Sequence, residues 1–227
     1  VENNDFSSSR YDEYPDFLTR LESLRPELST LAVLDWPPLG TVQDGGPLVS
    51  PAVDLVLNVN GDNLGYGPAD QLSTELAAER LRYGDPDATF VYLGDPDVVA
   101  HDTSSLSAEY RASIETADRQ IGELLEAVRQ RPSYGQEDWL ILSSTDHGRT
   151  DDGGHGGESE KELTIYYLVS GSSTVGLRES PEIVDVACTA LAHLGIEIAA
   201  EWDLDCAVSG VAGSSDGKPK LDSGDDA

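Results

Sequence analysis

The sequence lacks methionine, has only two cysteines and carries only three lysines in 227 residues. No apolar run approaches the roughly 18 residues that a helix needs to span a bilayer, and the first residues show no signal-peptide pattern. We therefore expect no membrane segment in this chain. Cys188 and Cys206 are too few for a disulfide scaffold and form no C-x-x-C pair. Two buried thiols are the first expectation, and a bridge between them stays open.

Basic side chains are scarce, because 14 Lys and Arg residues stand against 43 Asp and Glu residues, for a formal charge of -29. Proteins bind nucleic-acid phosphates through basic surfaces, so nucleic-acid binding of that kind is disfavoured. Most of the acidic residues are expected on the solvated surface. An acidic excess with little lysine also resembles the composition of halophilic proteins, because high ionic strength screens the repulsion between the charges.

Short apolar runs alternate with helical patterns along the chain. The apolar runs predict β-strands at residues 31–34, 53–59, 90–93, 139–142 and 163–169. Most are apolar at successive positions, which is typical of strands covered on both faces. The helical patterns lie at residues 14–24, 69–82, 107–131 and 181–194. This alternation predicts an α/β fold in which a mostly parallel sheet is sandwiched between helices.

The helix predicted over residues 107–131 has the clearest ends, since Ser107 is a suitable N-cap and Pro132 a suitable stop. The chain changes character near Ser209, after which Gly, Ser, Asp and Lys dominate. We therefore predict one domain over residues 1–208 and a disordered tail over residues 209–227.

Polar residues that packing does not explain follow two of the predicted strands. Asp97 and His101 follow the strand at 90–93, and Asp146 and His147 follow the strand at 139–142. Ligand sites of open parallel sheets lie beyond the carboxyl ends of the strands, so we expect these residues to converge. Asp and His together suit a divalent cation such as zinc.

A third group comes from a glycine-rich segment at residues 153–157, which lets the backbone turn and bring His155 beside His147. We expect His101, His147 and His155 to lie in loops at one edge of the sheet. Taken singly, each motif has a structural explanation as a capped loop or a turn. Their order along the chain favours a metal site, whereas His193 lies in a helical pattern and is interpreted as structural.

Three stretches, YLGDPDVVAH, SSTDHGRTDDGGHGG and ALAHLGIEIAAEWDLD, carry a family resemblance. Up to about Asp205 the chain resembles the alkaline phosphatase superfamily, and especially its type I phosphodiesterase and nucleotide pyrophosphatase branch. The resemblance implies an alkaline-phosphatase-like fold that is incomplete at the N-terminus. It also implies two divalent metal ions, best matched by zinc, that cleave phosphodiester or pyrophosphate bonds of a small phosphorylated substrate. The implied metal ligands are Asp97, His101 and His155 for one ion, and Asp146 and His147 for the other.

The resemblance also implies parts that have no match in these residues. An Asp ligand and a Ser or Thr nucleophile are expected upstream of Val1, as is any export signal, so no catalytic nucleophile is assigned in this chain. The first residues resemble the family segment in which an Asn binds a phosphate oxygen, which makes Asn4 the expected substrate-binding residue. We therefore expect a truncated chain that binds metal weakly and turns over little. Only seven residues separate His147 from His155, so the family's nucleotide preference is not carried over.

Two alternatives stay open. The first is another activity of the same superfamily, namely a phosphomonoesterase, a sulfatase or a phosphomutase, because these share the metal ligands. The second is a non-catalytic acidic module that binds calcium or a partner protein. The sequence contains no D-x-D-x-D-G loop that ends in a Glu, which disfavours a typical calcium site.

Overall fold

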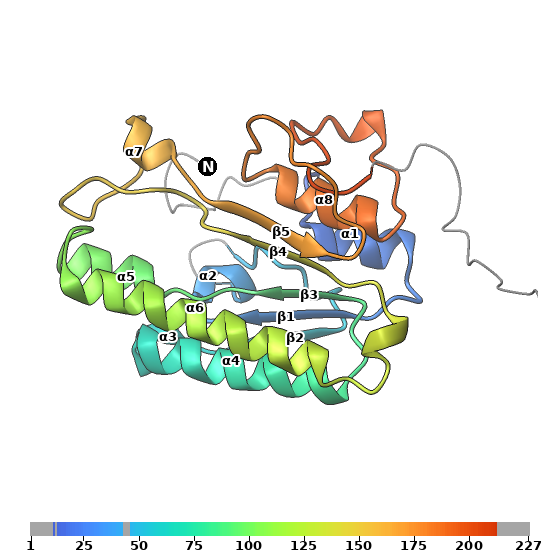
Figure 1. The fold of residues 1–227 in the computed structure, drawn as a ribbon, viewed down its shortest axis with the longest axis horizontal. Helices are drawn as coiled ribbons and strands as arrows, with labels where there is room; N and C mark the ends of the chain where they lie inside the picture. The colour runs from blue at the N-terminus through green and yellow to red at the C-terminus, as the bar shows by residue number, and fades with distance from the viewer. Residues whose placement is uncertain (1–10, 12, 43–45, 213–227) are drawn as a thin grey trace, which may run out of the picture. The chain divides into compact units, whose positions relative to one another are not determined.

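The computed structural model describes residues 11, 13–42 and 46–212 (Figure 1). The chain forms two compact units. The first unit comprises the residues up to Asp138 together with Ser144–Tyr166, and the second comprises Trp139–Ser143 and the residues from Tyr167 onward. Asn4 and residues 213–227 of the predicted tail lie outside the described residues. The assignment of residues 1–208 to one domain stays a prediction.

A parallel three-stranded sheet forms the centre of the first unit. Its strands are β1 (Thr30–Leu34), β2 (Leu55–Asn58) and β3 (Ala88–Val91), in the order β2-β1-β3. All five residues of β1 are buried, as the continuous apolar run predicts for a central strand. Because the strands are parallel, their carboxyl ends meet at one edge of the sheet.

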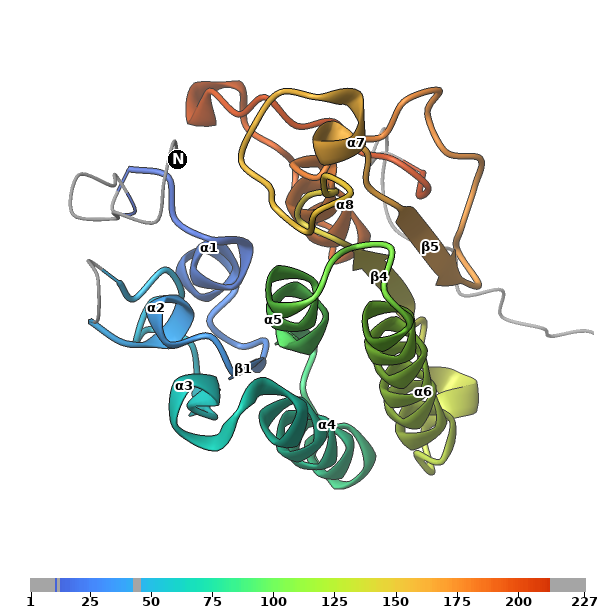
Figure 2. The same ribbon diagram turned by 90° about the vertical axis from the view of Figure 1, so that its left-hand side faces the viewer.

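Helices cover both sides of this sheet, with α1 and α4 on opposite sides of β1 (Figures 1 and 2). Leu31 and Val33 point to the same face of β1 and form a buried core with Ala77 of α4. The helices of the first unit are α1 (Phe17–Leu24), α2 (Pro37–Gly40), α3 (Gly61–Leu64), α4 (Tyr66–Tyr83), α5 (Asp95–Asp102), α6 (Ala108–Arg129), the 3-10 helix η2 (Tyr134–Gln136) and α7 (Glu160–Leu163). The predicted α/β class, with a parallel sheet between helices, is confirmed.

The ends of α6 follow the sequence signals. The side chain of Ser107 accepts a hydrogen bond from the backbone N–H of Tyr110, so it caps the helix as predicted. The helix packs along α4 (Figure 1) and adds Leu124 to the core beneath the sheet. None of the helices in the described part of the chain is long and apolar enough to cross a membrane.

The second unit contains strands β4 (Leu140–Ser144, of which Ser144 belongs to the first unit) and β5 (Tyr167–Gly171), helix α8 (Asp185–His193) and the 3-10 helix η3 (Ala200–Trp202). The prediction that the last strand begins at residue 163 is wrong. Ser159 and Glu162 form a capping box there, so the chain makes a helical turn over Glu160–Leu163 before it extends.

Cys188 and Cys206 form a disulfide with 6.1 Å between their Cα atoms, so the first expectation of two separate thiols is wrong. Hydrogen bonds between the segment after Cys206 and helix α8 explain the pairing. The carboxylate of Asp185 accepts a hydrogen bond from Ala207, and the hydroxyl of Thr189 accepts one from Ser209. These contacts bring residues 206–209 back to α8, which the linear spacing of the two cysteines does not reveal.

Candidate metal centre

Asp97 and His101 lie on helix α5, so the prediction that His101 lies in a loop is wrong. Pro96 is compatible with a helix here because it stands in the first turn, where its missing N–H is not needed. Residues four apart on a helix share one face. His101 Nε2 therefore lies 3.7 Å from Asp97 Oδ2.

The first turn of α5 is held by two buried carboxyl groups from other elements. Asp70 on α4 accepts hydrogen bonds from the backbone N–H groups of Gly94, at 2.9 Å, and Asp95, at 3.1 Å. Asp35, which follows β1 directly, also accepts from Gly94, at 3.3 Å. Both side chains are almost completely buried. Burial and the hydrogen bond to Asp70 raise the pKa of Asp35 to about 10, so Asp35 is neutral at pH 7.

Asp146 and His147 follow β4 after Thr145 and lie near the start of the segment that we call the ligand loop, residues 145–157. His147 Nδ1 lies 3.0 Å from the carbonyl oxygen of Gly148, a contact that places the proton on Nδ1 and leaves Nε2 free to accept. That Nε2 atom is 3.7 Å from Asp97 Oδ1 and 3.7 Å from Asp146 Oδ2. Asp146 itself is largely exposed, with 65% of its side chain accessible.

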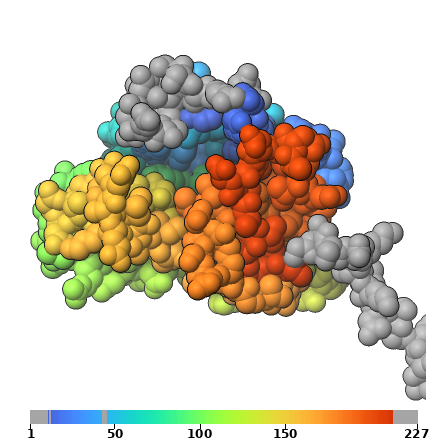
Figure 3. Space-filling model, turned by 90° about the horizontal axis from the view of Figure 1, so that it is seen from above, coloured from blue at the N-terminus to red at the C-terminus, as the bar shows by residue number. Residues whose placement is uncertain are grey.

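The ligand loop docks on α5 through its tight turn. Thr150 N–H donates to Gly154 O at 2.9 Å, and Gly153 between them has a φ of 94°. A Cβ atom at Gly153 would collide with the carbonyl oxygen of Ala100, so the turn lies directly on the helix backbone. Ser105 Oγ donates to Thr150 O at 2.7 Å. The space-filling view shows the yellow atoms, which include the ligand loop, beside green atoms of the segment that includes α5 and the start of α6 (Figure 3).

The helix and the loop together form a compact cluster of ligand atoms. One donor atom each from Asp97, His147 and His155 lies within 4.8 Å of the other two. His155 Nε2 is 3.5 Å from Asp97 Oδ1, and the rings of His147 and His155 stack with centroids 3.8 Å apart. The ring centroid of His101 is 4.9 Å from that of His155.

The structure thus brings all five predicted ligands into one neighbourhood, although its tightest group differs from the implied pairing. It places His147, rather than His101, with Asp97 and His155. The reason is the stacking of His147 on His155, which follows from the short turn between them. Their role as metal ligands stays a prediction.

The electrostatic state of the cluster suits a divalent cation. Desolvation, helped by His147 and Arg149, lowers the pKa of His155 to about 4, so its imidazole is neutral near pH 7. Neutral imidazole is the form that binds metals. Asp97 Oδ1 is buried and accepts no hydrogen bond from the described residues, although ionic neighbours face it. A buried carboxylate oxygen beside the nitrogen atoms of His147 and His155 fits a divalent metal ion by the chemistry of its donors.

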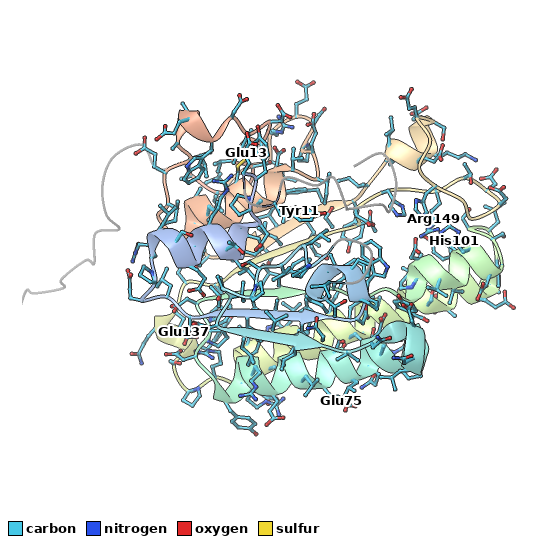
Figure 4. All side chains as sticks on the ribbon, turned by 180° about the vertical axis from the view of Figure 1, so that it is seen from behind. Tyr11, Glu13, Glu75, His101, Glu137 and Arg149 are labelled. Atoms are coloured by element: carbon cyan, nitrogen blue, oxygen red, sulfur yellow. A yellow bond between two sulfur atoms is a disulfide. The ribbon has the colours of Figure 1, made fainter. Side chains whose placement is uncertain are left out.

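Arg149 also contacts the ligand cluster, although the sequence motifs did not indicate it. One of its terminal nitrogens, Nη2, forms an ion pair with Asp97 Oδ1, and the other, Nη1, donates to Gly153 O at 2.7 Å. Only 7% of its side chain is exposed. Figure 4 labels Arg149 and His101 close together at the end of α5. The sequence feature that could have indicated Arg149 is a basic residue close to the Asp146 and His147 motif in a chain with only 14 Lys and Arg residues.

Comparison with known proteins adds independent evidence. Residues 29–153 match the family described as type I phosphodiesterase / nucleotide pyrophosphatase. The match includes Asp97, His101, Asp146 and His147, and it ends two residues before His155.

Two curated relatives carry the same printed name, 2,3-bisphosphoglycerate-independent phosphoglycerate mutase. The protein of Natronomonas pharaonis is 26% identical over 132 residues, and that of Haloquadratum walsbyi is 28% identical over 131 residues. Each alignment covers 55% of this chain and 24% of the relative, so the chain spans about a quarter of their length. The family match itself covers more than half of the 227 residues, and the chain therefore belongs to the type I phosphodiesterase and nucleotide pyrophosphatase family of the alkaline phosphatase superfamily.

Proposed function

We propose that this chain supplies the metal-binding part of a metal-dependent hydrolase that cleaves phosphodiester or pyrophosphate bonds with two divalent cations, best matched by zinc. The observation that carries the proposal is the approach of Asp97, His147 and His155 to within 4.8 Å of one another. The family membership supports a phosphoester substrate. The expected partner is a small phosphorylated molecule, because the charge of -29 disfavours nucleic acid.

The side chains divide the work of holding the cations. Asp97, His147 and His155 are proposed to hold one ion, and His101, which lies beside Asp97, and Asp146, which lies beside His147, are proposed to supply further ligands to the pair of ions. Bound divalent cations supply Lewis-acid stabilisation of phosphoryl oxygens and activation of a hydroxyl nucleophile. The N–H of His147 Nδ1, which points to Gly148 O, keeps its Nε2 atom directed at Asp97. This orientation is the part of the chemistry that the protein itself sets in advance.

The nucleophile stays unassigned. The family resemblance gives this role to a Ser or Thr that has no counterpart in the motifs of this chain, and it makes Asn4 the candidate for binding a phosphate oxygen. We therefore expect the 227-residue chain to bind zinc and phosphate but to hydrolyse substrates slowly.

The test is a zinc titration of the full chain against a chelating dye, followed by assays of an aryl phosphodiester with and without zinc. Zinc binding with low turnover is the expected result. Fast turnover would place the nucleophile within these residues, while the hydrolase proposal would stand. If the chain failed to bind zinc, or failed to bind inorganic phosphate, the hydrolase proposal would be overturned.

A second candidate is phosphoryl transfer within one substrate, and the names of the two curated relatives favour it. The same metal ligands serve both reactions, since each begins with attack on phosphorus. Phosphorus NMR of the zinc-loaded chain with phosphoglycerate separates them. Interconversion of the positional isomers supports transfer, whereas release of inorganic phosphate supports hydrolysis.

A further inference from the structure

The ligand cluster already contains a permanent positive charge. The guanidinium of Arg149 forms its ion pair with Asp97 Oδ1. This is the oxygen that His155 Nε2 faces at 3.5 Å and His147 Nε2 faces at 3.7 Å. Arg149 therefore contacts the carboxylate oxygen that a metal ion held by these three ligands would need.

The side chain of Arg149 is held in place by the ligand loop. Its Nη1 atom donates to Gly153 O at 2.7 Å, in the turn that docks on α5. Its side chain is 7% exposed, so the guanidinium is not a mobile surface group. With Nη1 held by the loop, the Nη2 and Nε edges of the planar fork remain for a second partner.

Electrostatics makes the arginine and a metal ion alternatives on this oxygen. Two cations on one carboxylate oxygen repel each other, and the repulsion is strongest where burial limits screening by water, as it does at the buried atom Asp97 Oδ1. Before a metal binds, Arg149 compensates the charge of Asp97, which is costly to bury unpaired. If a metal ion took Oδ1, the guanidinium would lose this partner and become available to a phosphoryl group bound at the same cluster. A guanidinium fork matches phosphate oxygens in a bidentate geometry.

We propose that Arg149 competes with the divalent cation for Asp97 Oδ1 and that metal binding transfers its guanidinium to the phosphoryl group of the substrate. Arg149 is thereby a phosphate-binding residue whose availability depends on occupancy of the metal site. The inference rests on the proposed function, because it takes the cluster to bind a divalent cation and a phosphoester.

The experiment compares the full-length wild-type chain with Arg149→Met, which is neutral, and Arg149→Lys, which keeps the charge without the fork. Arg111→Met, at an exposed position on α6, removes the same unit of charge outside the ligand cluster and serves as the matched control. Zinc affinity is measured by competition with a chelator. Binding of inorganic phosphate to the zinc-loaded proteins is measured by calorimetry.

The proposal predicts that removing the guanidinium changes the affinities for zinc and for phosphate in opposite directions. Arg149→Met should bind zinc at least about tenfold more tightly and phosphate at least about tenfold more weakly. Arg149→Lys should keep zinc affinity near the wild-type value and lose part of the phosphate affinity. Arg111→Met should change neither by more than about threefold. If Arg149→Met loses its circular-dichroism signature of folding, Arg149→Gln replaces it, because Gln is neutral and keeps a polar N–H donor.

Each other outcome is decisive. Weaker binding of both zinc and phosphate would show that Arg149 only fastens the loop, which overturns the inference and leaves the proposed function intact. Tighter zinc binding with unchanged phosphate binding would also overturn it. If neither the wild type nor any variant binds zinc, the metal centre of the proposed function falls together with the inference.

Discussion

Asp97 and His101 face each other across one turn of α5, with 3.7 Å between Asp97 Oδ2 and His101 Nε2. The other oxygen of Asp97 faces His147 and His155 from the ligand loop. One carboxylate therefore connects a helix-borne imidazole with two loop-borne imidazoles. This central position explains why the docking of the loop on α5 decides whether the ligands meet.

The three histidines should differ in their contribution to zinc affinity. His155→Ala removes a ligand atom of the tightest group, so we expect affinity to fall about 100-fold. His101→Ala should cost less, because His101 is more exposed and faces the outer oxygen of Asp97. His193→Ala on α8 is the matched control and should leave zinc affinity unchanged. Equal losses in all three variants, measured by chelator competition, would contradict the site.

The turn that docks on α5 can be tested with two glycines of nearly the same backbone conformation. Gly153→Ala should weaken zinc binding and lower the free energy of unfolding by roughly 1–3 kcal/mol, because a positive φ and a collision with Ala100 O both oppose the added methyl. At Gly156, with a φ of 95°, nothing lies within 4 Å of the added atom. Gly156→Ala therefore isolates the cost of the backbone. Similar zinc affinities in the two variants would argue against docking at Ala100.

Asp70 should be important for stability although it lies outside the ligand cluster. Asp70→Asn replaces a buried carboxylate that accepts the N–H groups of Gly94 and Asp95, so we expect a loss of roughly 2–3 kcal/mol in urea unfolding. Glu75→Gln is the control on the same helix. Glu75 is exposed and its carboxylate accepts a hydrogen bond from the side chain of Gln71, so its replacement should change stability by less than about 0.5 kcal/mol. A loss at Asp70 no larger than this would refute its anchoring role.

Asp35 predicts a specific pH dependence of stability. Its pKa is raised from 3.8 to about 10 in the folded protein, so the folded chain holds a proton that the unfolded chain releases above about pH 4. The stability that this proton provides is complete at low pH and declines as the pH rises toward 10. Asp35→Asn keeps a neutral donor at the same place, so its stability relative to wild type should increase from pH 5 to pH 9. A difference that stays constant across urea titrations at these pH values would contradict the raised pKa.

The sequence predicts those parts of the fold that local pattern determines. The apolar run of β1 and the Ser107 cap of α6 are both found where they were expected. Helix α5 escaped prediction because Asp95 and Pro96 also suit a turn, and because its anchor, Asp70, comes from a distant helix. Such long-range contacts leave no local pattern.

In the candidate site, too, the sequence motifs predicted part of the arrangement, whereas the contacts between distant residues were not predicted. The order of the Asp and His motifs was enough to predict that Asp97, His147 and His155 gather at one place. The sequence did not reveal the pairing of His147 with His155 or the ion pair of Arg149, because both depend on how the loop turns over α5. The buried pair of Asp35 and Asp70 was equally hidden, since one follows a strand and the other lies on a helix.

At the opposite end of α4, a single guanidinium joins several chain segments. Arg131 donates to the carbonyl oxygens of Leu81, at 2.6 Å, and Gly84, at 2.9 Å, and it pairs with Asp85 and Glu137. A cation at this helix end also offsets the partial negative charge of the last carbonyls.

From these contacts we expect the end of the first unit that contains Arg131 to be more rigid than the ligand loop. Backbone amides near Arg131 should exchange with deuterium only when the whole unit unfolds, because opening there breaks several hydrogen bonds of the buried Arg131 guanidinium at once. Amides of the ligand loop should exchange much sooner, through brief lifting of a segment held by a few contacts. Cations would then reach the ligand atoms when the ligand loop opens transiently, while the contacts around Arg131 stay formed.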